Sequence, residues 1–161
     1  MWMLPMIGIE SRRRLATTKN DPQRSGDRMM GTITGEDRIA IGELFARYCH
    51  RVDHGDTAGW LELFTPDGVF EVAGVMRLEG HEQVGAMPGV VAAQGGGKWR
   101  HQITSIVVDP GDGDDVALVT AYGLVTDWGN DGKPMTFSDY AITLNRVDSA
   151  WRIRTLVATT P

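Results

Sequence analysis

Five side chains that can donate, accept or transfer a proton fall within residues 47–56, the stretch RYCHRVDHGD. They are Tyr48, His50, Asp53, His54 and Asp56. A carboxylate beside an imidazole suits general acid–base chemistry, because the carboxylate orients the ring and stabilises its protonated form. The same residue types also gather at the solvated end of a helix. The elements that carry these side chains therefore decide between the two interpretations.

Residues 34–53 are predicted to form an amphipathic helix. Thr34 and Asp37 have the spacing of a capping box, with a hydroxyl at the cap and a carboxylate three positions later. Apolar side chains then recur with the period of one helix face. They are Ile41, Leu44, Phe45, Tyr48, Cys49 and Val52.

Asp53 follows Cys49 by four residues and so lies at the edge of the buried face. A carboxylate there is costly unless it has a partner. His50 is predicted to point to solvent, and His54 to lie in the helix cap. Tyr48 and Asp53 are therefore the inward candidates of the cluster.

The following residues predict a short helix and then a strand. Gly55 is suited to end the first helix, and Asp56 to cap a second one that carries Trp60. The sequence TPDG predicts a turn before a strand at 69–72, and a second short strand is expected around 75–78.

The middle of the chain predicts a third helix over 81–87, stopped at Pro88. The stretch AAQGGGKW, residues 92–99, predicts a flexible loop that could act as a lid hinge. The remaining sequence alternates with period two in four long segments. These are Trp99–Val108, Val116–Asp127, Met135–Arg146 and Trp151–Ala158. Helices followed by antiparallel strands indicate an α+β fold, with helices covering one face of a curved sheet.

The first of these strands offers Asp53 a partner. On an extended strand His101 shares a face with Trp99, Ile103, Ser105 and Val107. A histidine among mostly apolar neighbours is either a satisfied core residue or a functional one. The residues alone leave both interpretations open.

Four motifs in this order resemble the SnoaL-like branch of the NTF2-like superfamily. They are RYCHRVDHGD, W-x-x-LFTPDGVF, RHQITSIVVD and a closing W-R-I after a tight turn. The resemblance covers about residues 36–158. It implies a conical α+β barrel in which a curved antiparallel sheet and two or three N-terminal helices enclose a hydrophobic pocket. It also implies a homodimer or homotrimer. The superfamily includes scytalone dehydratase, a dehydrochlorinase, polyketide cyclases, ketosteroid isomerase and proteins that only bind ligands.

The resemblance implies roles for individual residues. Asp53 and His101 match the carboxylate–histidine pair of scytalone dehydratase and the dehydrochlorinase, with His101 as the base. Tyr48 matches the tyrosine that stabilises an oxyanion in ketosteroid isomerase. Trp60, Tyr122 and Tyr140 are the candidate substrate-binding residues. Each of these role assignments has a structural alternative. The carboxylate–histidine pair could be an inherited buried hydrogen bond without chemistry, and the aromatic residues could serve only for packing.

Differences from these relatives, and the lack of certain motifs, limit which reactions and cofactors are expected. The second histidine of scytalone dehydratase has no counterpart near Tyr122, and the base of ketosteroid isomerase falls on Val72. His50 and His54 have a spacing that could chelate zinc, but no third ligand is evident, so no metal site is expected. No glycine-rich phosphate-binding motif occurs, so no cofactor is expected.

Charge and composition limit the partners and the location. The chain carries a net charge of −5, of which residues 1–30 contribute +3 and the other 131 residues −8. An acidic body repels phosphate backbones, so nucleic-acid binding is not expected. Cys49 is the only cysteine, and no apolar run reaches the length of a membrane span. We therefore expect a cytoplasmic protein that does not bind membranes.

The sequence predicts one domain, residues 34–161, after an extension over 1–33 that is disordered or dispensable. A basic transit peptide is the alternative for that segment. The predicted function is a cofactor-independent lyase or isomerase that acts on a small hydrophobic, cyclic or polyketide-like substrate. Proton abstraction by the His101–Asp53 pair would lead to dehydration, elimination or cyclisation of that substrate. The alternative is a non-catalytic protein on the same scaffold that binds a small ligand or forms a subunit interface, such as a ring-hydroxylating dioxygenase small subunit.

Overall fold

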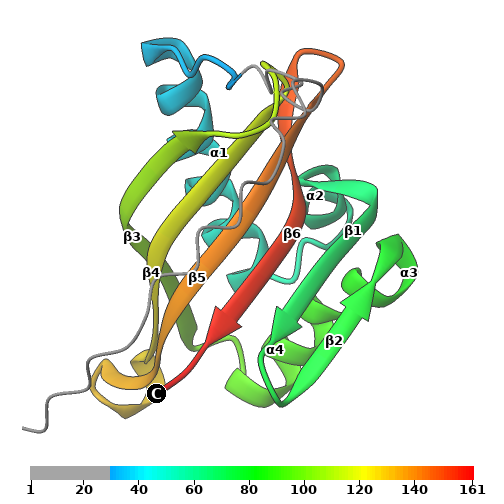
Figure 1. Cartoon of the computed structure of the whole chain (residues 1–161). Coiled ribbons are helices and arrows are strands. Elements are labelled where there is room, and N and C mark those ends of the chain that lie inside the picture. Colours follow the sequence, from blue (N-terminus) through cyan, green and yellow to red (C-terminus); the bar gives the residue numbers. More distant parts are fainter. Residues whose placement is uncertain (1–29) are drawn as a thin grey trace, which may run out of the picture.

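A computed structural model of the chain describes residues 30–161, in which helices cover one face of a six-stranded sheet (Figure 1). The first helices are followed by a short strand pair and two further helices, and then by four long strands. The elements are α1 (Gly35–Asp53), α2 (Thr57–Glu62), β1 (Phe64–Val72), β2 (Met76–Glu79), α3 (Gly80–Val84), α4 (Met87–Gly95), β3 (Trp99–Pro110), β4 (Val116–Asp127), the 3₁₀ turn η1 (Trp128–Asn130), β5 (Lys133–Val147) and β6 (Ala150–Thr159).

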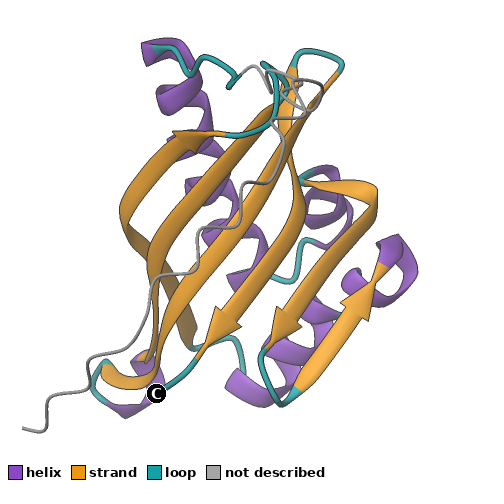
Figure 2. Ribbon diagram, in the orientation of Figure 1, coloured by secondary structure: helices purple, strands orange, loops and turns teal. Residues whose placement is uncertain are grey.

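The sheet has the strand order β2-β1-β6-β5-β4-β3. All neighbouring strands are antiparallel except β1 and β6, which run parallel. The predicted α+β class is confirmed. The sheet curves around α1 but does not close, because β2 and β3 remain its two edges (Figure 2). The sheet and the helices together therefore enclose the interior of the domain, and no closed barrel forms.

Helix α1 begins and packs as its sequence predicts. Thr34 accepts a hydrogen bond from the backbone of Asp37, whose carboxylate in turn accepts from the backbone of Thr34. The apolar face is buried against the sheet, with Ile41, Leu44, Phe45, Tyr48 and Val52 each at most 5% exposed. Burial of this face fixes the rotation of α1 and so the direction of the residues at its end.

Two predicted boundaries are wrong. The sequence TPDG does not form a separate turn but lies within β1, where the pairing with β6 shifts register between Phe64 and Val69. Pro88 does not stop a helix: it lies in the first turn of α4, where its missing N–H costs nothing. Residues 92–95 of the predicted loop therefore belong to α4, and only Gly96 and Gly97 follow with positive φ.

The face alternation predicted for β3 holds only as far as Ile103. Ser105 has a φ of 54°, and the pairing with β4 shifts between Thr104 and Val107. This bulge reverses the alternation, so that Val107 is 52% exposed while Val108 is buried. His101 lies before the bulge and keeps its predicted inward direction.

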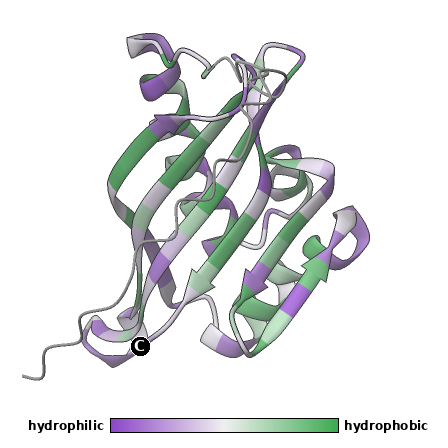
Figure 3. Cartoon of the chain, viewed as in Figure 1, coloured by the Kyte–Doolittle hydropathy of each residue, from purple (hydrophilic) through white to green (hydrophobic). Residues whose placement is uncertain are grey.

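The outer face of the sheet carries several large apolar side chains. Hydrophobic and hydrophilic residues alternate along the strands (Figure 3). Leu118, Tyr122 and Phe137 are 47%, 47% and 53% exposed, and the rings of Tyr122 and Phe137 lie 5.7 Å apart. We call these three residues, together with Val107, the outer apolar patch.

The expected extension over 1–33 lies largely outside the described residues, which begin at Met30. Met30 forms a β-bridge with Asp112, and Gly31 donates a backbone hydrogen bond to Gly111. Ile33 packs against the core. Within the described part of the chain, no helix is both long enough and apolar enough to cross a membrane.

Candidate active site

The last residue of α1 and the start of β3 meet at one carboxylate. Nδ1 of His101 lies 2.6 Å from Oδ1 of Asp53, and the backbone N–H of His101 donates to Oδ2 at 3.0 Å. The side chain of His101 is 14% exposed and that of Asp53 is 4% exposed. The predicted pair is therefore formed, and its two members are nearly withdrawn from water.

The contact between Asp53 and His101 determines which ring nitrogen is free. A carboxylate only accepts hydrogen bonds, so Nδ1 carries the hydrogen that is directed at Asp53. Nε2 then holds a lone pair in the neutral ring. His101 also lines a cavity of the protein, and its Nε2 is the ring nitrogen that Asp53 leaves without a contact.

His50 and His54, the two histidines at the end of α1, are solvent-exposed. Nδ1 of His54 lies 2.7 Å from the carbonyl of His50, and the two rings stack with centroids 6.1 Å apart. This contact closes the end of α1 and does not point into the cavity. Among residues 30–161, no group of three or more His, Cys, Asp or Glu side chains is placed to hold a metal ion.

The cavity next to His101 has a volume of about 420 Å³. Its deep end is formed by buried residues of α1, α2, β1, β5 and β6, and its opening lies between α4, the β1–β2 turn and the start of β5. The lining is mainly apolar and includes no Asp, Glu, Lys or Arg. The lining residues are Tyr48, Val52, Trp60, Phe70, Val72, Val75, Met76, Met87, Val90, Val91, Gln94, Trp99, His101, Gly123, Val125, Met135, Thr136, Ser138, Tyr140, Ala158 and Thr160.

Two tyrosines bring hydroxyl groups to this lining. Burial raises the pKa of Tyr48 well above its usual value, with smaller contributions from the neighbouring Tyr140 that include a hydrogen bond. Burial likewise raises the pKa of Tyr140 to about 12. Both phenols therefore stay protonated at neutral pH. Each hydroxyl has one hydrogen, so the bond between the two phenols leaves one O–H that can donate to an oxygen in the cavity.

Gly123 makes room for one of these tyrosines. A Cβ atom on Gly123 would lie 2.4 Å from Cζ of Tyr140 and 2.7 Å from its hydroxyl oxygen. The phenol of Tyr140 thus crosses directly over the β4 backbone, which only glycine permits at this distance.

The structure brings together five of the six predicted site residues and separates one. Trp60 is fully buried beside Tyr48, with ring centroids 4.5 Å apart, and lines the cavity with it. Tyr122 lies in the outer apolar patch on the other face of the sheet and does not line this cavity. The reason is the period of β4, in which Ala121 points inward and Tyr122 outward.

Several lining residues escaped the sequence analysis. Ser138 is 4% exposed and precedes Tyr140 by two residues, so the period of β5 could have identified it. Gln94 was missed because its segment was predicted as a loop, and Val91 because the predicted helix stopped at Pro88, whereas both lie in α4.

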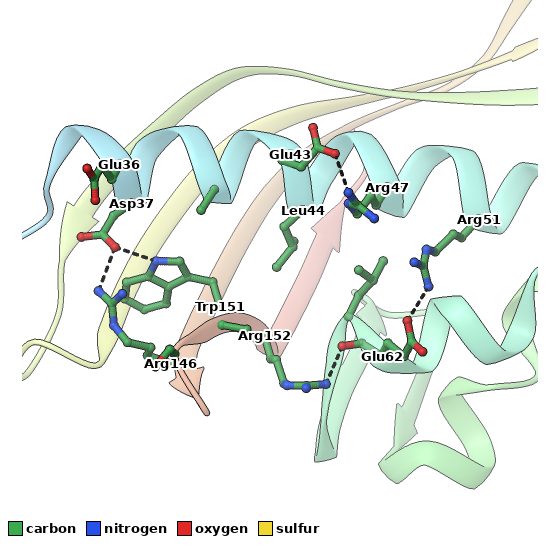
Figure 4. A pocket seen from close by; sticks show the side chains of 14 residues that line it. Glu36, Asp37, Glu43, Leu44, Arg47, Arg51, Glu62, Arg146, Trp151 and Arg152 are labelled. Atoms are coloured by element: carbon green, nitrogen blue, oxygen red, sulfur yellow. Dashed lines mark hydrogen bonds and ion pairs between the residues drawn. The ribbon is translucent and has the colours of Figure 1, made fainter.

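A second hollow, of about 680 Å³, differs sharply from the cavity in charge. It lies along α1 beside the β5–β6 turn (Figure 4). Some of its charged side chains pair with one another: Arg47 with Glu43 at 2.9 Å and Arg51 with Glu62 at 3.0 Å. This charged lining contrasts with the uncharged lining of the cavity beside His101.

The family model of the SnoaL-like domain matches residues 34–157. The chain belongs to the SnoaL-like family. The match spans the helices and the sheet except for the end of β6, and it includes Asp53, His101 and all the cavity-lining residues of this SnoaL-like protein except Ala158 and Thr160. No curated protein matches the chain in sequence.

Solved structures share the fold of this SnoaL-like domain. An NTF2-like protein with a cystatin-like fold from Novosphingobium aromaticivorans has 24% identity and a TM-score of 0.68, covering 78% of this chain and 82% of its own. A protein of that organism provisionally named an aromatic ring hydroxylase has 26% identity and a TM-score of 0.67, covering 80% and 92%. Another, provisionally named a scytalone dehydratase, has 18% identity and a TM-score of 0.66, covering 78% and 85%.

Proposed function

We propose that this protein is a cofactor-independent enzyme in which His101 abstracts a proton from a carbon atom of a small hydrophobic cyclic substrate. The observation that carries the proposal is the 2.6 Å contact between His101 and Asp53 at the wall of an apolar cavity. A buried carboxylate that holds Nδ1 leaves Nε2 as a base directed toward the bound molecule. The comparison with a protein provisionally named a scytalone dehydratase agrees with this chemistry.

The reaction we favour is the dehydration of a β-hydroxy ketone. Nε2 of His101 takes a proton from the carbon next to the carbonyl, and the electron pair moves onto the carbonyl oxygen. The resulting enolate accepts a hydrogen bond from the phenol of Tyr140 or Tyr48. As the enolate collapses to the unsaturated ketone, the β-hydroxyl group leaves with the proton from Nε2, which releases water and restores the neutral ring. Cyclisation would begin with the same proton abstraction.

The first step can be tested before the natural substrate is known. The C1 protons of 2-tetralone are activated by both a carbonyl group and an aromatic ring, and their exchange for deuterium in D₂O is visible by NMR. We expect the protein to accelerate this exchange and His101→Ala to reduce it to the buffer rate while the circular dichroism spectrum is retained. Undiminished exchange in His101→Ala would refute the assignment of the base.

A second candidate function is a subunit that binds a partner without catalysis. The outer apolar patch favours it, because Leu118, Tyr122 and Phe137 are large apolar side chains exposed on one face of the sheet, and exposed apolar patches mark interaction sites. A structural neighbour is provisionally named an aromatic ring hydroxylase. A homodimer or homotrimer would cover the same patch without excluding catalysis. Copurification of a different chain at fixed stoichiometry, combined with no exchange activity, would favour this function over the first.

A further inference from the structure

The opening of the cavity is lined by apolar side chains that are exposed to solvent, unlike those of its interior. Three of its lining residues are apolar and yet exposed: Val75, Val90 and Met135 are 76%, 37% and 46% exposed. They come from the β1–β2 turn, α4 and β5, so three separate elements converge on one apolar rim. We call these three residues the apolar rim.

The apolar rim is continuous with the cavity. Next to it the same lining carries three exposed polar residues, Gln94, Thr136 and Thr160, none of which is charged. From the deep end to the opening, the lining therefore offers no partner for a formal charge other than the imidazole of His101. In the hollow along α1, by contrast, charged side chains dominate.

We infer that the substrate is an uncharged cyclic ketone bearing an apolar arm, which leaves the cavity and packs on the apolar rim. This inference rests on the proposed function only for the position of the ketone, at the deep end beside His101 and Tyr140. The arm is a chain or second ring that covers Val75, Val90 and Met135. Covering exposed apolar side chains is favourable in proportion to the area removed from water.

The absence of charge from the lining supports the first part of the inference. A carboxylate or phosphate inside this cavity would lose its hydration without gaining a cation or a set of N–H donors. The two protonated tyrosines and Ser138 are instead suited to a neutral carbonyl or hydroxyl group.

The experiment measures the affinity of a series of probes by the fluorescence of the tryptophans, two of which, Trp60 and Trp99, line the cavity. The probes are 2-tetralone, its 6-ethyl, 6-butyl and 6-hexyl derivatives, and 2-tetralone-6-carboxylate. We expect the affinity to rise by about fourfold for each methylene that reaches the rim. The carboxylate is expected to bind more weakly than the ethyl derivative, because it gains no contact with the apolar rim and no Lys or Arg of the lining pairs with it.

Variants assign the effect to the apolar rim. Val75→Ser combined with Met135→Ser should remove at least half of the gain per methylene. The matched control is Val107→Ser, which alters an exposed valine of the outer apolar patch that does not line the cavity. It should leave the gain per methylene unchanged.

The outcomes separate this inference from the proposed function. If the chain-length dependence persists in His101→Ala, the rim binds the arm whether or not His101 is a base. Affinity independent of chain length, an equal gain per methylene in the rim variant, or tight binding of the carboxylate would each overturn the inference. The inference would also be overturned if the probe affinity did not depend on chain length and the protein cosedimented with phosphatidylcholine vesicles, but the rim variant did not. The rim would then contact a membrane.

Discussion

Asp53 accepts two hydrogen bonds from His101, one from the ring and one from the backbone N–H of the same residue. The first orients the imidazole, and the second attaches the start of β3 to the end of α1. One carboxylate thus determines both where the base lies and which of its nitrogens is free.

Asp53→Asn should separate these two contributions. The carboxamide has one accepting oxygen instead of two, places an NH₂ donor against the N–H groups of His101, and carries no charge to stabilise the imidazolium. We expect the rate of 2-tetralone exchange to fall by about 10²–10⁴. The free energy of unfolding should fall by roughly 1–3 kcal/mol, because a buried donor loses its partner. Exchange by NMR and urea unfolding measure the two effects.

The control for this variant is Asp139→Asn, which changes an exposed carboxylate on β5. It should alter neither the exchange rate nor the stability appreciably. If Asp53→Asn lowered stability but left exchange at the wild-type rate, Asp53 would have a structural role only.

Gly123→Ala should disturb the cavity through Tyr140. The added methyl group meets the phenol at 2.4 Å, so Tyr140 must move or β4 must bend. We expect a loss of roughly 1–3 kcal/mol in the free energy of unfolding, as for other overpacked sites. Tyr140→Leu removes the obstructing ring, so the double variant should be less destabilised than the sum of the single variants.

Gly42→Ala provides the matched control. Gly42 lies within α1, and a Cβ atom there meets nothing within 4 Å. The same chemical change should therefore stabilise the protein, by up to about 1 kcal/mol, because alanine favours the helix. Additive effects of Gly123→Ala and Tyr140→Leu would show that the two residues do not compete for space.

The helix and strand periods marked Asp53 and His101 as candidates in the sequence, and the resemblance to the family implied that they pair. The capping box at Thr34 was predicted from the sequence, because a local hydrogen bond has a local sequence signature. The bulge at Ser105 and the helical role of Pro88 were not. The bulge depends on the pairing with a distant strand, and a proline is as typical of the first turn of a helix as of the position after its end.

Tyr122 illustrates the same limit in the site. On a strand of known register, its inward neighbour Ala121 and its outward direction follow at once. The sequence alone gives the alternation but not which of the two faces the helices cover. The resemblance to a family indicated the neighbourhood and left the face undetermined.

Asp37 should make the stability of the protein depend on acid pH. Hydrogen bonds, first from the backbone of Thr34 and then from its hydroxyl, Trp151 and Arg146, hold the pKa of Asp37 well below its usual range despite its burial. The ionised form is thus favoured more in the folded state than in the unfolded one. Its contribution is full above the unfolded pKa of about 3.9 and is lost as the pH falls below that value.

Asp37→Asn is therefore expected to lower the free energy of unfolding by roughly 1–3 kcal/mol at pH 7. The difference from the wild type should shrink as the pH is lowered from 4 toward 2, measured by urea unfolding at each pH. Asp131→Asn, at an exposed turn position, should show no such pH dependence. A difference that stayed constant down to pH 2 would show that packing, and not ionisation, accounts for the effect.

The outer apolar patch is expected to hold copies of the chain together. Phe137 is 53% exposed and lies beside Tyr122, so a charge at this position would be buried without a partner in an assembly built on this face. Phe137→Asp should weaken self-association by at least about 30-fold, the effect of a typical hot-spot residue. Light scattering after size-exclusion chromatography, over a range of concentrations, measures the change. Ile39→Asp is the control, because Ile39 is 75% exposed on α1, away from the patch. A wild-type protein that is monomeric at all concentrations, or an equal effect of both variants, would exclude this face as the interface.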